Sequence, residues 1–171
     1  ASNFDAESFE SLGDVVIAGW FCLYVEEDKE KGGLVFQQWP LASCYITSTR
    51  ADGRIDTVVR EYSLTANQCL REFGEDKVSE KVRQMVADKK GDDSVKLAIQ
   101  IQPRSLKIDN PKNAKEMPFE SVTIEIDHKH TVKESGYHEF PCVIPRWVRV
   151  PDTFYGVGPV LDALPDSMML N

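Results

Sequence analysis

The pattern of apolar positions predicts a helix over residues 4–20. Within it, apolar residues recur at steps of three and four and form one apolar face, as in an amphipathic helix: Phe9, Leu12, Val16 and Trp20. Asp5 and Glu7 fall in the first turn, where the helix dipole favours negative charge. These local signals agree on the same helix.

Two strand pairs follow in the pattern. The runs "FCLYVEE" and "LVFQQW" flank the turn signal "KEKGG", which predicts a β-hairpin with a longer loop. The segment "SCYITSTRADGRIDTVVREYSL" predicts a second hairpin that turns at Asp52 and Gly53, a pair favoured in tight turns because both central positions need a positive φ.

A pair of helices is predicted over residues 65–74 and 78–91. Thr65 and Gln68 have the spacing of a capping box, and Gly74 is a natural stop. The second helix places an apolar stripe toward the protein interior, formed by Val82, Met85 and Val86.

Three further strands are predicted beyond the helices, over residues 94–101, 121–126 and 128–135. The first two alternate apolar and polar residues with the period of two that a one-sided sheet needs. Their apolar positions are Val95, Leu97, Ile99 and Ile101, then Val122, Ile124 and Ile126. The polar stretch between Pro103 and Pro118 is long for a loop and predicts a mobile excursion or an interaction loop. The order of elements predicts an α+β fold, a mostly antiparallel mixed sheet with an N-terminal helix and a central helix pair.

The C-terminal stretch, residues 141–171, predicts an extended proline-rich arm that leads into a helix. Prolines remove strand hydrogen-bond donors, so "PCVIPRWVRVP" is an edge strand or arm and not a central strand. Gly156 and Gly158 are interpreted as a sharp turn, and Pro159 suits the first turn of a helix beginning near Val160. Apolar ends with nothing to cover them indicate missing chain or a neighbouring subunit. No repeat or linker divides residues 1–171, which we therefore expect to form a single domain, and the lack of an initiator Met leads us to expect a segment of a longer chain.

Composition narrows the function classes. The net charge is −8, and an acidic domain is repelled by phosphate backbones, which argues against tight non-specific binding of nucleic acid. No apolar run approaches the roughly 20 residues of a membrane span, so no membrane partner is expected. The widely spaced cysteines are predicted to be buried free thiols: Cys22, Cys44, Cys69 and Cys142.

Two clusters offer candidate chemistry. "DHKH" brings Asp127, His128 and His130 close in sequence and suggests a metal site, against the simpler interpretation of solvated turn residues. Cys142 follows His138 by four residues, as a nucleophile and its base could, but Pro141 lies between them. The sequence has no GxSxG, P-loop or HExxH motif. We therefore predict no catalytic, metal or cofactor site, and keep a Cys/His-dependent enzyme as a remote alternative.

The C-terminal stretch contains the series Gly-Tyr, Pro, Arg-Trp and Tyr-Gly-x-Gly-Pro, followed by Leu-Pro-Asp. In its order and spacing, this series resembles that of the head-to-tail connecting (portal) protein family of short-tailed bacteriophages. The similarity extends upstream to "GRIDTVVREYSLTANQCLREFG" and "GWFCLYVEE", so it covers nearly the whole chain. The matching residues are Gly136, Tyr137, Pro141, Arg146, Trp147, Tyr155, Gly156, Gly158, Pro159, Leu164, Pro165 and Asp166.

The resemblance implies a structural part of the portal wing, in a ring of usually twelve subunits at one capsid vertex. Double-stranded DNA would pass through the ring during packaging and ejection without sequence-specific binding. It also implies terminase, scaffold and tail adaptor proteins as partners, a place in the virion after synthesis in the bacterial cytoplasm, and no catalytic residues. DNA-contacting residues are not assigned. A different head-tail adaptor or tail module of similar α+β build is the alternative.

Overall fold

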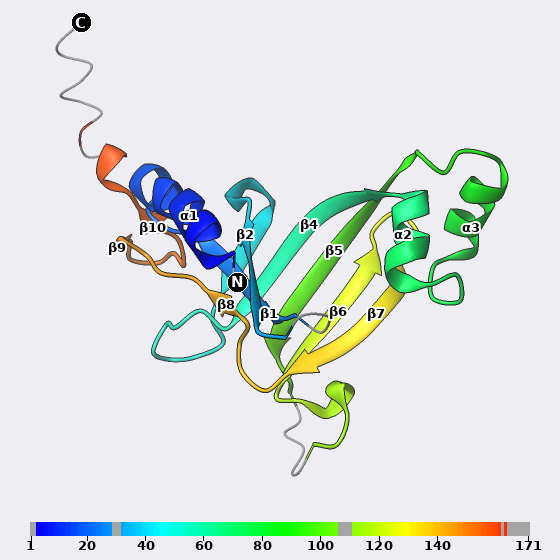
Figure 1. The fold of residues 1–171 in the computed structure, drawn as a ribbon. Coiled ribbons are helices and arrows are strands. Elements are labelled where there is room, and N and C mark those ends of the chain that lie inside the picture. Colours follow the sequence, from blue (N-terminus) through cyan, green and yellow to red (C-terminus); the bar gives the residue numbers. More distant parts are fainter. Residues whose placement is uncertain (1–2, 29–31, 106–110, 162, 164–171) are drawn as a thin grey trace, which may run out of the picture. The chain divides into compact units, whose positions relative to one another are not determined.

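The computed structural model describes residues 3–28, 32–105, 111–161 and 163. Runs of antiparallel strands are separated by helices along these residues, which confirms the α+β prediction (Figure 1). The chain divides into two compact units, residues 1–55 with 141–171 (unit 1) and residues 56–140 (unit 2). That residues 1–171 form one folding domain stays a prediction. Within the described ranges, no helix has the length and apolar character needed to cross a membrane.

Unit 1 contains the N-terminal helix, the first hairpin and the C-terminal arm. Strands β2, β1 and β8 form one antiparallel sheet in that order, and β9 pairs with β10. Its elements are α1 Phe4–Ala18, β1 Cys22–Glu27, β2 Leu34–Trp39, the 3-10 helix η1 Leu41–Ser43, β3 Cys44–Thr47, β8 Cys142–Val143, β9 Val148–Arg149 and β10 Gly156–Val157. The arm therefore supplies an edge strand, as the prolines predict.

The core of unit 1 forms around β1. Cys22, Leu23 and Tyr24 are consecutive and all buried, so both faces of β1 are covered, while β2 and β8 pair with its two edges. The ring of Tyr24 stacks on Trp39, with centroids 4.8 Å apart. Cys142 of β8 is also buried, and all four cysteines are buried thiols outside any disulfide, which confirms the prediction for them.

Unit 2 is an antiparallel sheet with two helices. Strands β4, β5, β6 and β7 are neighbours in that order. The elements are β4 Thr57–Thr65, α2 Ala66–Phe73, α3 Glu80–Ala87, β5 Ser94–Pro103, the 3-10 helix η2 Ala114–Glu116, β6 Phe119–Glu125 and β7 His130–Tyr137. Both predicted helices and all three predicted strands are present.

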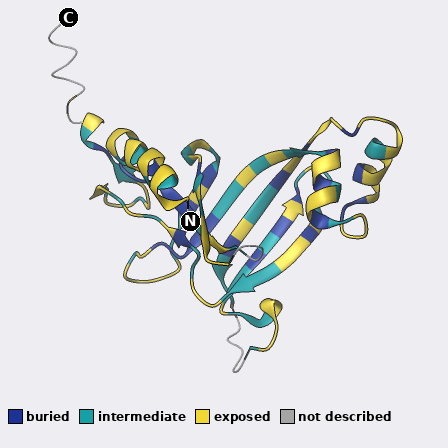
Figure 2. Ribbon diagram, viewed as in Figure 1, coloured by how far each residue is buried: buried dark blue, intermediate teal, exposed yellow. Residues whose placement is uncertain are grey.

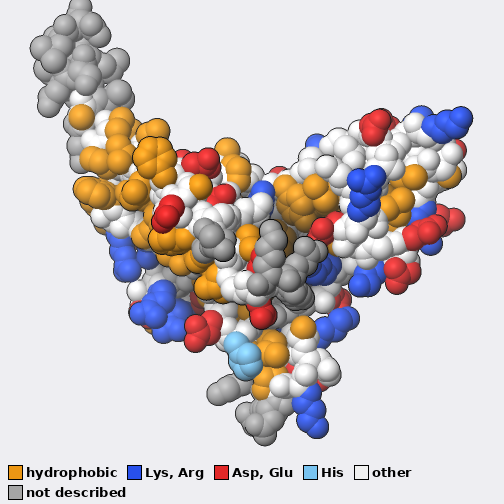
Figure 3. Space-filling model, in the orientation of Figure 1, with side chains coloured by type: hydrophobic (Ala, Val, Ile, Leu, Met, Phe, Trp, Pro, Cys, Tyr) orange, Lys and Arg blue, Asp and Glu red, His pale blue; other side chains and the backbone are white. Residues whose placement is uncertain are grey.

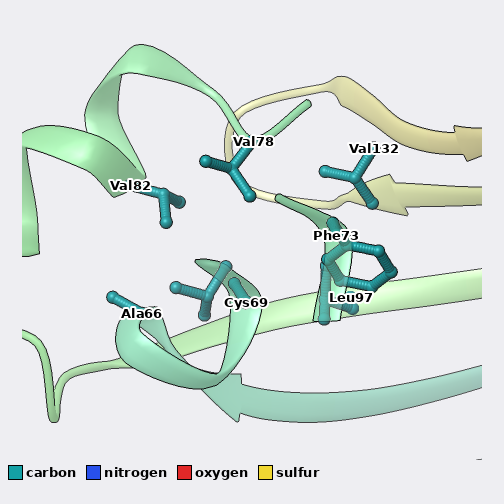
Figure 4. Close-up of a cluster of buried hydrophobic side chains, with 8 residues drawn as sticks. Ala66, Cys69, Phe73, Val78, Val82, Leu97 and Val132 are labelled. Atoms are coloured by element: carbon teal, nitrogen blue, oxygen red, sulfur yellow. The ribbon is translucent and has the colours of Figure 1, made fainter. Parts of the chain in front are cut away.

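The helices of unit 2 pack on the sheet through one apolar cluster (Figure 4). It consists of Ala66, Cys69, Phe73, Val78, Val82, Val95, Leu97 and Val132, with Met85 and Val86 packed against it. The capping box predicted for α2 is present, since Thr65 Oγ1 accepts from Gln68 N at 3.2 Å and Gln68 Oε1 accepts from Thr65 N at 2.8 Å. Local sequence signals therefore locate both ends of α2 correctly.

Strand β6 buries the face opposite to the one its apolar pattern predicts. Its buried side chains are Ser121, Thr123 and Glu125, while Ile124 is exposed. In the antiparallel register Glu125 lies opposite Leu97, and directly opposite residues share a face. Leu97 belongs to the core beneath the helices, so the register carries the polar residues of β6 to that side.

The turn at Gly53 differs from the predicted two-residue hairpin. Gly53 has a φ of 68° and its N–H donates to Arg50 O at 3.1 Å, so a turn is present. The connection between β3 and β4 is longer, however, and Ser48 organises it: its hydroxyl donates to Arg54 O at 2.6 Å and accepts from Arg50 N at 3.1 Å. Side-chain hydrogen bonds of this kind compete with strand pairing.

Candidate interaction surface

Helix α1 is attached to the sheet of unit 1 through its polar side. Asn3 bonds both backbone groups of Phe36, donating to its O at 2.7 Å and accepting from its N at 2.9 Å. Glu7 Oε2 accepts from Gln38 N at 2.7 Å, and the Gln38 side-chain amide donates to Asp14. Burial raises the pKa of Asp14, although that hydrogen bond acts in the opposite sense. Polar side chains thus bond the backbone groups at the outer edge of β2, which could otherwise pair with another strand.

The outward side of α1 is apolar. Its exposed fractions are 80% for Phe9, 60% for Leu12, 47% for Val16 and 65% for Ile17. Figure 2 shows this side of α1 as exposed, and Figure 3 shows hydrophobic side chains gathered over it. We call these four residues the α1 stripe. The predicted helix is therefore correct, but its apolar face points away from unit 1, and Trp20 lies buried beyond the helix end.

Exposed apolar side chains are concentrated in unit 1. Among the described residues, Ile124 is the one large exposed apolar side chain that belongs to unit 2. Beyond the α1 stripe, the arm contributes Val143, Trp147, Val148, Phe154, Tyr155, Val160 and Leu161. Monomeric proteins rarely expose apolar surface on this scale, and large patches mark interaction sites.

The arm closes on the end of α1. Gly19 caps the helix in the left-handed conformation, with a φ of 82°, and its carbonyl accepts from Trp147 N at 2.7 Å. Trp20 forms an antiparallel bridge with Arg146, and its ring meets Tyr155 edge-on with centroids 5.4 Å apart. The Arg-Trp and Tyr-Gly pairs singled out in the sequence thus meet at one place.

Three glycines make this closure possible. A Cβ on Gly158 would lie 2.6 Å from Val16 O, one on Gly156 would lie 2.2 Å from Gly19 O, and one on Gly19 would lie 2.1 Å from the carbonyl carbon of Val157. Neither Gly156 nor Gly158 has a positive φ, and Gly156 lies in β10. Their role is close backbone contact, so the interpretation as a sharp turn is wrong.

Arg146 links the arm to the turn at Gly53. Its guanidinium donates to Gly53 O at 3.0 Å and to Phe154 O at 3.3 Å. Burial, and then the neighbouring charge of Arg149, lower the pKa of Arg146 from its ordinary value. Beyond the closure, Pro159 begins a helical stretch over residues 159–161, which agrees with its predicted place in a first turn.

The remaining motif residues lie elsewhere. Pro141 O accepts from Val25 N at 2.9 Å in unit 1. In unit 2, Gly136 lies in β7, where a Cβ would sit 2.2 Å from Ala114 O of η2, and Tyr137 lies opposite Phe119. Pro165 falls outside the described residues, as do Leu164 and Asp166.

The segment between Pro103 and Pro118 is tied at its base. Arg104 N donates to Pro118 O at 2.8 Å, its side chain donates to Met117 O at 3.1 Å, and it pairs with Glu120 at 3.3 Å. Residues 106–110 are not among those described, and the assignment of the segment as an interaction loop stays a prediction.

The candidate cluster of Asp127, His128 and His130, weighed above against solvated turn residues, separates in the structure. His128 Nδ1 lies 2.8 Å from Glu125 Oε2, whereas His130 Nε2 lies 2.8 Å from Lys77 O, and Asp127 is exposed. Over the residues that the structure describes, no group of three or more His, Cys, Asp or Glu could hold a metal ion. Cys142 is buried while His138 is exposed.

A buried cluster that was not predicted from the sequence lies at the end of the β6–β7 hairpin. Glu125 is fully buried and accepts from Ser79 N at 2.9 Å, and Ser79 Oγ lies 3.3 Å from the same His128 nitrogen that Glu125 contacts. Burial raises the pKa of Glu125, but hydrogen bonds from Ser79 and His128 outweigh it and hold the pKa below its ordinary value. The one sign of this cluster in the sequence was that Glu125 and His128 are three residues apart.

This cluster does not have the geometry of a catalytic triad. In a triad the acid and the hydroxyl face different nitrogens of the histidine ring, whereas here both lie on Nδ1. Ser79 Oγ also accepts from Val82 N at 3.3 Å and caps α3. The three side chains therefore hold the start of α3 against the end of β6.

The fold and this surface define a structural module. Its distinctive features are the outward apolar face of α1 and the arm that packs closely on the end of that helix. A model of the family described as "Bacteriophage head to tail connecting protein" matches residues 1–171, and the chain belongs to that family. It is 32% identical over 139 residues to the "Probable portal protein" of Bordetella phage BPP-1, covering 80% of this chain and 25% of that protein. It is also 32% identical over 111 residues to the "Portal protein" of Salmonella phage epsilon15, covering 64% of this chain and 20% of that protein. The chain thus spans a quarter or less of the length of these relatives.

Proposed function

We propose that this chain is a segment of the wing of a phage portal protein, a structural subunit of the ring through which DNA is packaged and ejected. The outward apolar surface of unit 1 is the main support for this role, because this segment by itself leaves that surface in water. Membership of the head to tail connecting family supports it.

The charge of the chain supports the same role. A conduit for DNA must not hold its cargo, and each phosphate bound by a Lys or Arg would add friction to translocation. The net charge of −8 opposes such binding. In this proposal the subunit is not an enzyme and uses no cofactor; the ring has twelve copies and meets terminase, scaffold and tail adaptor proteins at the portal vertex of the virion.

The test is the assembly state of the full-length protein that contains these residues. Negative-stain microscopy and native mass spectrometry of that protein, with and without scaffold, are expected to show closed rings. A protein that stays monomeric at high concentration with scaffold present would refute the proposal. Density for the segment at the tail or baseplate, and not at the portal vertex, would favour the adaptor alternative.

A further inference from the structure

Gly13 lies in the middle of α1, where a glycine is costly. It has no positive φ, and nothing lies within 4 Å of the Cβ position that an alanine would fill. A glycine inside a helix is about 1 kcal/mol less favourable than alanine. Nothing in the described chain uses its small size, and the open space above it suits a side chain of a molecule that packs on α1 from outside.

Such a molecule would pack on the α1 stripe. Phe9, Leu12, Gly13 and Val16 stand at positions i, i+3, i+4 and i+7, the four corners of the hole that receives a knob in helix–helix packing. The missing side chain of Gly13 deepens this hole. We propose that a helix of a neighbouring copy of the full-length chain lies on the α1 stripe and inserts a large apolar side chain over Gly13. This inference rests on the proposed ring.

The exposed area is sufficient for a contact between copies. Gly158 packs on the carbonyls of Val16 and Ile17, so the arm lies against the end of α1 that carries these two residues of the α1 stripe. Together with four exposed arm residues close in sequence to the contacts at Gly19 and Gly158, the stripe presents on the order of 800 Å² of apolar surface, which is about one partner's share of a standard protein interface. Those arm residues are Trp147, Val148, Val160 and Leu161.

The charges beside the stripe define the partner helix further. Asp5 and Glu10 are exposed and stand seven residues before Leu12 and Ile17, so they border the α1 stripe. The helix that covers the stripe is therefore expected to carry Lys or Arg beside its apolar knob. Subunits around a ring meet through two different surfaces, so this helix comes from another part of the neighbour and not from its own α1.

Photocrosslinking of the full-length protein tests the contact directly. With p-benzoylphenylalanine in place of Ile17, irradiation of assembled rings is expected to give covalent dimers of the chain on denaturing gels. The same group in place of Ala87, an exposed position on α3, is the control and should give at least tenfold less dimer. Cross-links confined to one chain, or formed with a different virion protein, would overturn the inference.

Substitution at Gly13 tests the hole. Gly13→Leu fills it and is expected to raise about tenfold the concentration needed for half-maximal assembly, since overpacking is costly. Ala87→Leu adds similar bulk on α3 and should leave assembly unchanged. If rings form but Gly13→Leu assembles like the unsubstituted protein, the inference fails while the proposed function stands. If no rings form at all, the proposed function fails first.

Discussion

Replacing Glu125 should destabilise this chain in a pH-dependent way. The carboxylate is fully buried and accepts two hydrogen bonds, from Ser79 N at 2.9 Å and from His128 at 2.8 Å. Glu125→Ala would leave both donors without their acceptor and create a cavity, at a cost of about 3–5 kcal/mol. Glu125→Gln keeps one carbonyl acceptor but loses the charge, and should cost about 1–2 kcal/mol.

The pH dependence follows from the lowered pKa of Glu125. Its ordinary value is 4.5, and the pKa in the folded chain lies below that. A group with a depressed folded pKa contributes stability that is present above the ordinary value and is lost as the pH falls through the folded pKa. The difference in unfolding free energy between the unsubstituted chain and Glu125→Gln should therefore be full at pH 7 and shrink as the pH falls below 4.5.

Urea denaturation followed by circular dichroism between pH 7 and pH 3 provides the measurement. Glu134→Gln is the matched control, because Glu134 pairs with Lys115 on the surface and its loss should change stability little at any pH. Equal denaturation midpoints for Glu125→Gln and the unsubstituted chain at pH 7, or a gap that does not narrow in acid, would refute the structural role assigned to Glu125.

The other predictions concern the arm, the α2 cap and a buried thiol. Gly158→Ala should push the arm away from the end of α1, so limited proteolysis should cleave the arm faster than in the unsubstituted chain. Gly13→Ala, at a position with open space for a Cβ, should instead raise the melting temperature of the chain. Equal proteolysis rates for Gly158→Ala and the unsubstituted chain would contradict the close contact. Thr65→Ala removes the cap of α2 and should cost about 1 kcal/mol in urea denaturation, and a neutral result would show that the capping box contributes nothing. Burial raises the pKa of Cys69 to about 11, so this thiol should react with Ellman's reagent at pH 8 only after unfolding, and rapid labelling of the folded chain would contradict its burial.

Features encoded by neighbouring residues were predictable. The capping box of Thr65 and Gln68 depends on two residues three apart, and the alternation along β5 depends on the extended backbone alone. The sequence could also single out Arg146, Trp147 and Gly158, because the motif that contains them resembles a known family. It could not show what those residues contact, since Gly19 and Trp20 lie more than a hundred positions away.

The amino-acid sequence by itself determined the longer helices and strands, because backbone geometry sets the periods of 3.6 and 2 from local residues. Only the tertiary structure decided which face of each element is buried, because a periodic pattern is the same whichever way the element turns. In β6, pairing with β5 carries Glu125 and not Ile124 into the core. In α1, hydrogen bonds to the edge of β2 hold the polar side inward and leave the apolar side exposed.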